Sequence, residues 1–301
     1  MMINFLSQMN LIPKNFIVAS MIDTLKENPE TGAEKVFEMA DKLVKEPKMI
    51  ALLEQVKDAY YTNPTIRMYS KNLIYNTRKN CLNHLVQNIL IKHLLEGSSK
   101  RERLAAPHAI VLNTEGMTFD EVDHIISQAK NLSIHLIMLT GGKLAKNPRT
   151  FELYEQYADI QFLVFTKSEA LTMDYCENLA EAGNVVPLVM TNEAVPHLEH
   201  LKVAGLLYGI ITWEQDLALL PFIRQGARFH WYMASHFERD FKQRVEATRG
   251  KLPYVAMCVQ NEGGKLTFAE TINEEVYRIT FPEINKLDLD KKSLNSLFKM
   301  W

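Results

Sequence analysis

Cysteine is scarce in this sequence, and the few cysteines lie far apart. Cys81, Cys176 and Cys258 are the three in 301 residues. An odd number at such spacings forms no disulfide framework, and none belongs to a Cys-x-x-Cys pair that would hold a metal or act in redox chemistry. We therefore expect each one to be a buried thiol.

The sequence also lacks an excess of one charge and any long apolar run. The 34 Lys and Arg residues nearly balance 36 Asp and Glu residues, and the formal net charge is -2. This argues against a nucleic-acid partner or a polybasic membrane surface. No stretch reaches the roughly 18 apolar residues of a membrane span, and the first residues do not form a secretory signal. The sequence predicts a cytoplasmic protein with no membrane span.

Residues 1–100 are predicted to form an all-helical region. Apolar residues recur with a helical period from Lys14 to about Gly97. Pro29, Pro47 and Pro64 mark the places where one helix ends and another begins. The pattern indicates about four helices, of which the longest, Thr65 to Glu96, is expected to break near Asn80.

Residues 101–260 alternate short apolar runs with amphipathic segments. The runs expected to be strands are 109–112, 134–139, 160–165, 185–189, 206–211, 227–233 and 254–259. The expected helices are 118–131, 149–157, 168–182, 195–204, 214–225 and 237–249. Such alternation indicates right-handed βαβ units around a parallel sheet. The predicted fold class is α/β, a partial (β/α) barrel of about six to seven parallel strands preceded by the helical region.

Residues 261–301 are expected to form a C-terminal hairpin and a helix. Asn261 to Lys265 is a turn cluster, with strands expected at 265–271 and 275–281, and a short helix follows at 291–300.

Polar residues follow every predicted parallel strand, where chemistry collects in such folds. Thr140-Gly141-Gly142-Lys143 follows the second strand. Its glycines would let backbone amides approach a carboxylate or phosphate, or would simply make a tight turn. Lys143 and Lys167, on neighbouring strand ends, would hold an anion between them or remain solvated. Thr166 precedes Lys167 at the same end.

Two groups of side chains have the chemistry of acid–base catalysts or metal ligands. Glu193, Glu214, His236 and Glu262 follow different strands and would form a cluster if they all turned inward, although strand-end carboxylates also cap helices. His197 and His200 have a ligand-compatible spacing on one helix, but without a third ligand in register they indicate an exposed helix.

The aromatic strand Arg228 to Met233 offers two faces. Alternation sends Phe229, Trp231 and Met233 to one face and His230 and Tyr232 to the other. Either set would stack on a ligand or pack as core.

Three segments together resemble the radical S-adenosylmethionine enzymes, closest to the branch that includes adenosyl-hopene synthase. They are Pro107–Asn113, Met117–Asp123 and Leu139–Gly142, and the likeness covers roughly residues 105–260. In that family a loop after the first strand carries Cys-x3-Cys-x2-Cys, which holds a [4Fe–4S] cluster that chelates the cofactor. Here Asn113-Thr114-Glu115-Gly116-Met117 runs straight into the helix, and the cysteines are missing.

At other strand ends, too, this sequence lacks residues of the family's functional motifs. The family's Gly-Gly-Glu-Pro is Gly141-Gly142-Lys143-Leu144, which replaces an attractive carboxylate by a cation. The family's Thr-Asn-Gly is Thr166-Lys167-Ser168. The resemblance therefore implies a pseudoenzyme with no [4Fe–4S] cluster, acting as a binding or scaffold protein or as a partner subunit of an active relative or of itself.

Two alternatives stay open at this stage. The first is a non-radical enzyme that uses Lys143, Lys167, Glu193 and His236, with Glu193 and His236 as the catalytic candidates. The second is a small-molecule binding protein that still takes S-adenosylmethionine. Its expected ligand-binding residues are Thr140, Gly141, Gly142, Lys143, Thr166, Lys167, His230 and Tyr232.

Overall fold

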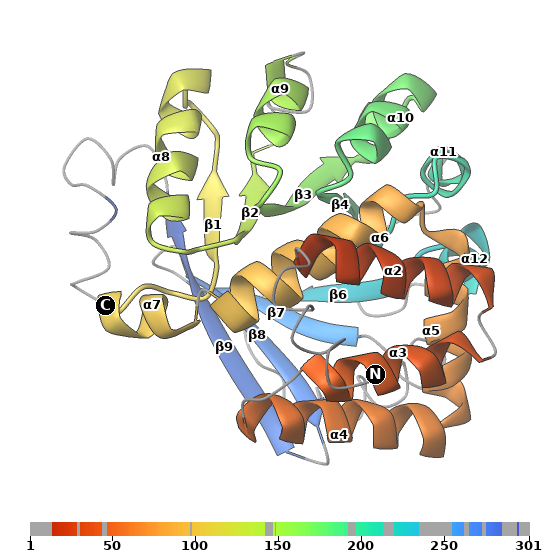
Figure 1. The fold of residues 1–301 in the computed structure, drawn as a ribbon. Coiled ribbons are helices and arrows are strands. Elements are labelled where there is room, and N and C mark those ends of the chain that lie inside the picture. Colours follow the sequence, from red (N-terminus) through yellow and green to blue (C-terminus); the bar gives the residue numbers. More distant parts are fainter. Residues whose placement is uncertain are drawn as a thin grey trace.

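The computed structural model describes residues 14–28, 31–43, 47–96, 98–141, 147, 149–191, 197–212, 220–234, 255–261, 265–272, 275–284 and 294. Its first part is helical, as the sequence predicts, and its second part alternates strands with helices (Figure 1). No helix in the described part of the chain is long and apolar enough to cross a membrane.

The helices of the N-terminal region follow one another with short breaks. They are α2 (Lys14–Glu27), α3 (Gly32–Leu43), α4 (Pro47–Thr62), α5 (Pro64–Asn76), α6 (Lys79–Leu85), the π-helix η2 (Val86–Glu96) and α7 (Ser98–Leu104). The side chain of Asn63 accepts hydrogen bonds from the amides of Thr65 and Ile66 and so caps α5. The long predicted helix breaks at Thr77 and Arg78, slightly before Asn80, because the Arg78 amide leaves the helix to donate to the Gly205 carbonyl.

In the described part of the chain, nine strands form a closed barrel in chain order. They are β1 (Ile110–Asn113), β2 (Leu136–Thr140), β3 (Gln161–Lys167), β4 (Val185–Met190), β5 (Gly209–Thr212), β6 (Phe229–Ala234), β7 (Val255–Asn261), β8 (Lys265–Ile272) and β9 (Glu275–Ile284). The strands β1 to β7 are parallel, which confirms the predicted α/β barrel-like fold of about six to seven parallel strands; β8 and β9 close the ring that the sequence predicts as partial.

The predicted C-terminal hairpin completes the ring. The strand β8 pairs antiparallel with β7 and β9, and β9 then pairs parallel with β1 through Val111–Glu283 and Leu112–Ile284. The hairpin is therefore part of the same sheet as the barrel strands. The predicted helix at 291–300 falls almost wholly outside the described residues.

The helices between the strands cover the outside of the barrel. They are α8 (Phe119–Asn131), α9 (Arg149–Gln156), the 3-10 turn η4 (Ser168–Ala170), α10 (Met173–Ala182), α11 (Leu198–Val203) and α12 (Leu220–Gln225). Thr118 and Glu121 form a capping box at the start of α8, the helix predicted at 118–131. The predicted helix at 237–249 lies outside the described residues.

Strand alternation separates two apolar cores. Ile110, Leu112, Ile137 and Leu139 belong to the larger core, which packs against the helices. A second group fills the inside of the barrel, and its buried members are Ala109, Val111, Met138, Phe165, Leu188, Ile211, Met233 and Phe281. The inside of the barrel is thus packed with side chains.

The N-terminal helices bind the turns that lead into the strands. Arg101 donates to the Ser133 carbonyl before β2, at 2.9 Å, and His84 donates to the Ala158 carbonyl before β3, at 3.0 Å. Asn80 donates to the Glu181 carbonyl before β4 at 2.7 Å. The Arg78 amide reaches the Gly205 carbonyl before β5 at 2.6 Å, and the Tyr69 hydroxyl reaches the Arg228 carbonyl before β6. We call these contacts the carbonyl belt.

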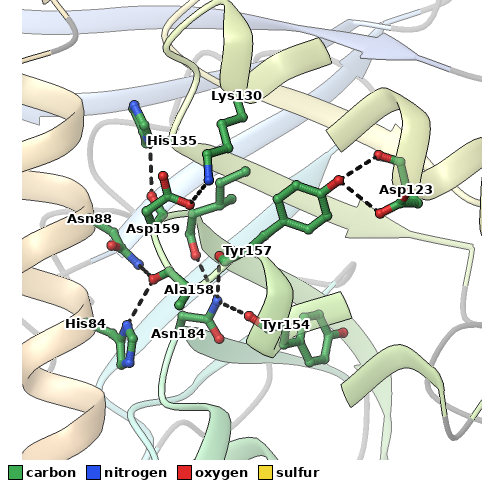
Figure 2. A network of polar contacts seen from close by, with 11 residues as sticks. His84, Asn88, Asp123, Lys130, His135, Tyr154, Tyr157, Ala158, Asp159 and Asn184 are labelled. Atoms are coloured by element: carbon green, nitrogen blue, oxygen red, sulfur yellow. Dashed lines mark hydrogen bonds and ion pairs between the residues drawn. The ribbon is translucent and has the colours of Figure 1, made fainter. Parts of the chain in front are cut away.

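Figure 2 shows the part of the belt around the turn before β3. His84 and Asn88 both donate to the Ala158 carbonyl, while the Lys130 ammonium lies 2.8 Å from an Asp159 carboxylate oxygen. Behind the turn, the fully buried Asn184 amide donates to the carbonyls of Tyr154, Tyr157 and Ile160 at 2.9 to 3.1 Å. Because the helical region covers this end of the strands, the opposite end is where a site must be sought.

Candidate functional site

The carboxyl end of β1 is held by its own neighbours. The amide and hydroxyl of Thr114 both donate to the Thr140 carbonyl, at 3.1 and 2.7 Å. The Asn113 side-chain oxygen accepts from the Glu115 amide at 3.1 Å. These bonds leave Thr114 buried and join the ends of β1 and β2.

The connection from β1 to α8 is a single tight turn. The Met117 amide donates to the Thr114 carbonyl at 3.2 Å, and Gly116 between them has a φ of 74°, which glycine adopts without strain. The capping box of Thr118 begins the helix directly afterwards. Residues 114–118 are therefore the whole connection, and they include no cysteine.

Gly141 is a glycine because the end of β1 approaches it closely. Its φ is +93°, and a Cβ at this position would lie 2.8 Å from the Glu115 amide nitrogen and 2.9 Å from the Asn113 side-chain oxygen. The chain thus uses the missing side chain for contact between two strand ends. Thr140 is half-buried beside it, and a role of Thr140 or Gly141 toward a ligand stays a prediction.

Glu283 is a strand-end carboxylate that sequence reasoning missed. The side-chain Nδ2 atom of Asn113 donates to a Glu283 carboxylate oxygen at 3.2 Å, and Glu283 is half-buried. The two residues are 170 positions apart, and they meet because β9 pairs with β1. No local pattern signals such a contact.

Thr166 and Lys167 belong to opposite faces of β3. Alternation puts Lys167 on the face of Leu163 and Phe165, which pack inside the barrel, and Thr166 on the helix side. Thr166 is buried, whereas Lys167 is exposed at the rim. Of these two, Lys167 is the residue that can meet a ligand entering the mouth of the barrel.

His230 lies on the helix-facing side of β6. It is buried, and its Nε2 atom lies 2.8 Å from the Thr212 hydroxyl oxygen. Burial lowers the pKa of His230 to about 4, so the ring is neutral near pH 7. The ligand role of His230 stays a prediction, as does that of Tyr232, whose side chain lies outside the described residues.

The other face of β6, together with Phe165 of β3, forms an aromatic row inside the barrel. The ring of Trp231 lies 6.1 Å from that of Phe165 and 5.9 Å from that of Phe229. Phe229 lies across Gly209 of β5, where a Cβ would be only 2.2 Å from its ring. We call Phe165, Phe229 and Trp231 the aromatic row.

Several predicted residues cannot be placed. Gly142, Lys143, Glu193, Glu214, His236 and Glu262 lie outside the described residues, so the predicted acid–base cluster stays a prediction. In contrast, His197 and His200 lie together at the start of α11, with ring centroids 5.2 Å apart.

The described cysteines do not fit an iron–sulfur cluster at the end of β1. Cys81 lies in α6 and Cys176 in α10, and both are buried in the core between barrel and helices. Burial raises the pKa of Cys81 to about 11 and that of Cys176 to about 12, whereas cluster ligands are thiolates. The side chain of Cys258 lies outside the described residues.

Three solved structures are distantly similar to this chain. No protein-family model and no curated protein sequence matches this chain. SuiB of Streptococcus suis bound to S-adenosylmethionine is 12% identical with a TM-score of 0.42, over 70% of this chain and 63% of SuiB. A second SuiB structure gives the same identity and TM-score over 82% and 65% of the two chains.

A third likeness is weaker. The radical S-adenosylmethionine methyltransferase TsrM of Kitasatospora setae, with cobalamin and a [4Fe–4S] cluster bound, is 12% identical with a TM-score of 0.29. That match covers 59% of this chain and 39% of TsrM. This chain thus spans less than two thirds of each of these proteins, and no residue role is transferred from them.

Proposed function

We propose that this chain is a degenerate relative of radical S-adenosylmethionine enzymes that binds a partner protein and performs no radical chemistry. The connection between β1 and α8 carries this proposal. The family's Cys-x3-Cys-x2-Cys motif is longer than the whole of residues 114–118, whose polar groups are used by the turn, the cap and the end of β2. The buried, protonated thiols of Cys81 and Cys176 support it further.

Anaerobic reconstitution with iron and sulfide tests the loss of the cluster. We expect less than stoichiometric iron and acid-labile sulfide after desalting, and no broad charge-transfer absorption in the visible range. Cys258→Ser is the informative variant, because Cys258 is the cysteine whose side chain lies outside the described residues. One cluster per chain with matching labile sulfide would overturn the proposal.

A partner role has support from the exposed face of α5. Met68 and Tyr75 are 61% and 76% exposed, and they lie two helical turns apart on the same face. Lys71 and Asn72 lie between them, so the face presents two large apolar side chains among polar ones, a mixture that protein-binding surfaces share. We propose that this face contacts the apolar surface of another protein, an active relative or a second copy of the chain.

Co-purification from the native cell tests the partner role. We expect the tagged full chain to retain one stoichiometric partner, and the variant Met68→Ser/Tyr75→Ser to lose it. Val203→Ser is a matched control, because Val203 is 69% exposed and lies on a different helix, α11. Recovery of the wild-type chain only as a free monomer would contradict a protein partner.

A second candidate function is binding of S-adenosylmethionine without a cluster. The half-buried rings of Phe229 and Trp231 in the aromatic row favour it, because they keep some ring surface for stacking, and Lys167 is exposed at the rim. Calorimetric titration with the cofactor is the test, with Trp231→Leu as the variant expected to lose the heat of binding. No heat at millimolar ligand would eliminate this candidate. The non-radical enzyme that uses Lys143, Lys167, Glu193 and His236 stays a prediction.

A further inference from the structure

Three potential metal ligands meet at the start of α11, on the connection that follows the carboxyl end of β4. One ligand atom from each of His197, Glu199 and His200 lies within 4.8 Å of the others. The sequence suggests the two histidines but not the carboxylate, because the helix begins only at Leu198 and His197 lies outside its regular turn. Because of the backbone conformation of His197, the carboxylate of Glu199 lies close to both histidines as a third potential ligand.

His197 has a left-handed backbone, which turns its ring toward His200. Its φ is 74°, a value that few residues other than glycine adopt and in which histidine is enriched. The two rings stack with centroids 5.2 Å apart and planes 23° from parallel. His197 and Glu199 are exposed and His200 is half-buried, so an ion from solution can reach all three.

A contact outside the group prepares His200 for metal binding. Its Nδ1 atom lies 2.7 Å from the Leu171 carbonyl oxygen, in the connection between β3 and α10. A carbonyl only accepts hydrogen bonds, so Nδ1 carries the proton and Nε2 keeps its lone pair. Metal-binding histidines almost always donate their second ring nitrogen in this way, which fixes the tautomer and the ring orientation. Leu171 itself is buried and anchors this contact.

We propose that His197, Glu199 and His200 bind a divalent transition metal of the zinc type, with His200 coordinating through Nε2. Two imidazoles and one carboxylate suit zinc, cobalt or nickel, whereas magnesium and calcium prefer oxygen ligands. Zinc lies about 2.0 to 2.2 Å from such ligands, so on binding the side chains rotate to bring the three ligand atoms closer together than the present spacing of up to 4.8 Å. Three protein ligands leave the fourth position to water or to a group of a binding partner.

Cobalt and zinc titrations of the full chain, freed of any histidine tag and of metal, test this site. We expect one equivalent of Co²⁺ to produce d–d absorption bands, one equivalent of Zn²⁺ to remove them, and zinc to raise the melting temperature. His197→Asn keeps a residue that tolerates the left-handed backbone, and His200→Gln keeps a donor for Leu171. Each variant should weaken binding about tenfold or more.

The matched control is His124→Gln, because His124 is an exposed histidine on α8. This variant should bind cobalt like the wild type. If the double variant His197→Asn/His200→Gln, shown by circular dichroism to be folded, binds one equivalent as tightly as the wild type, the proposed site is wrong. Absence of stoichiometric binding by the wild type would refute it equally, and neither result bears on the cluster or the partner.

Discussion

Arg101 is a buried cation whose hydrogen-bond acceptors are carbonyl groups. It is 2% exposed, and its guanidinium donates to the carbonyls of His93 and Ser133 at 2.6 and 2.9 Å. These carbonyls lie in the last turn of η2 and just beyond α8, where helix dipoles are negative. Two helix ends therefore stabilise the charge that a carboxylate would usually neutralise.

We expect Arg101→Met to lower the free energy of unfolding by about 2 to 4 kcal/mol, because two buried carbonyls lose charged donors. Arg101→Lys should recover little, since an ammonium cannot match the planar fork. Urea denaturation measures both effects. Arg103→Met is the control, because Arg103 is exposed on the same helix. Equal losses in the two Met variants would contradict the role of the buried carbonyl contacts.

Buried neutral histidines make stability depend on pH. Burial lowers the pKa of His230 to about 4, and burial together with the charge of Arg101 lowers that of His93 to about 3. An unfolded histidine binds a proton near pH 6.5, so between about pH 6.5 and 4 the unfolded state binds more protons. The contribution of these histidines to the free energy of unfolding is therefore fully present above pH 6.5, and it decreases as the pH falls through this window.

His230→Gln should flatten this decrease by up to about 1.4 kcal/mol per pH unit, the contribution of one proton. Urea unfolding between about pH 7 and pH 5 measures the slope. His124→Gln, which changes an exposed histidine, should keep the wild-type slope. An unaltered slope in His230→Gln would show that His230 has the same pKa in the folded and the unfolded chain, which would contradict the effect of its burial.

At the level of the elements, Gly209 and Phe229 depend on each other. The Phe229 ring occupies the place of a Cβ on Gly209 in the neighbouring strand. We expect Gly209→Ala to cost about 1 to 3 kcal/mol by displacing the ring, and to cost much less when Phe229 is already alanine. A double-mutant cycle by denaturation measures this coupling, and additive costs would contradict it.

Elements with local signals are predicted well from the sequence, and those that depend on distant contacts are not. The capping box of Thr118 and Glu121 and the Asn63 cap lie within one turn of the helices that they start, so their residues suffice. The break at Arg78 depends on Gly205, and the closure of the ring depends on β9 meeting β1. The polar strand ends were found, but Glu283 and the use of Gly141 by β1 required the fold.

For the whole molecule, the carbonyl belt joins the predicted regions 1–100 and 101–260. Its donors come from the N-terminal helices α5 to α7 and the break after α5, and its acceptors come from residues just before the strands β2 to β6. The division into separate regions stays a proposal, and we expect the two to unfold together. A fragment of residues 105–301 should lack near-ultraviolet circular dichroism, because its turns lose their donors. A fragment with native-like dichroism would show that the barrel folds alone.

The belt also has a consequence for the order of folding during synthesis. Its donors, from Tyr69 to Arg101, leave the ribosome before any of their acceptors. The hydroxyl of Tyr69 has no native acceptor until Arg228, 159 residues later, has been made. The edge of β1 stays unpaired on one side until Ile284 has been made. Contacts so distant in sequence slow folding and keep strand edges open to aggregation. Newly made chains should therefore need protection by chaperones until β9 has left the ribosome.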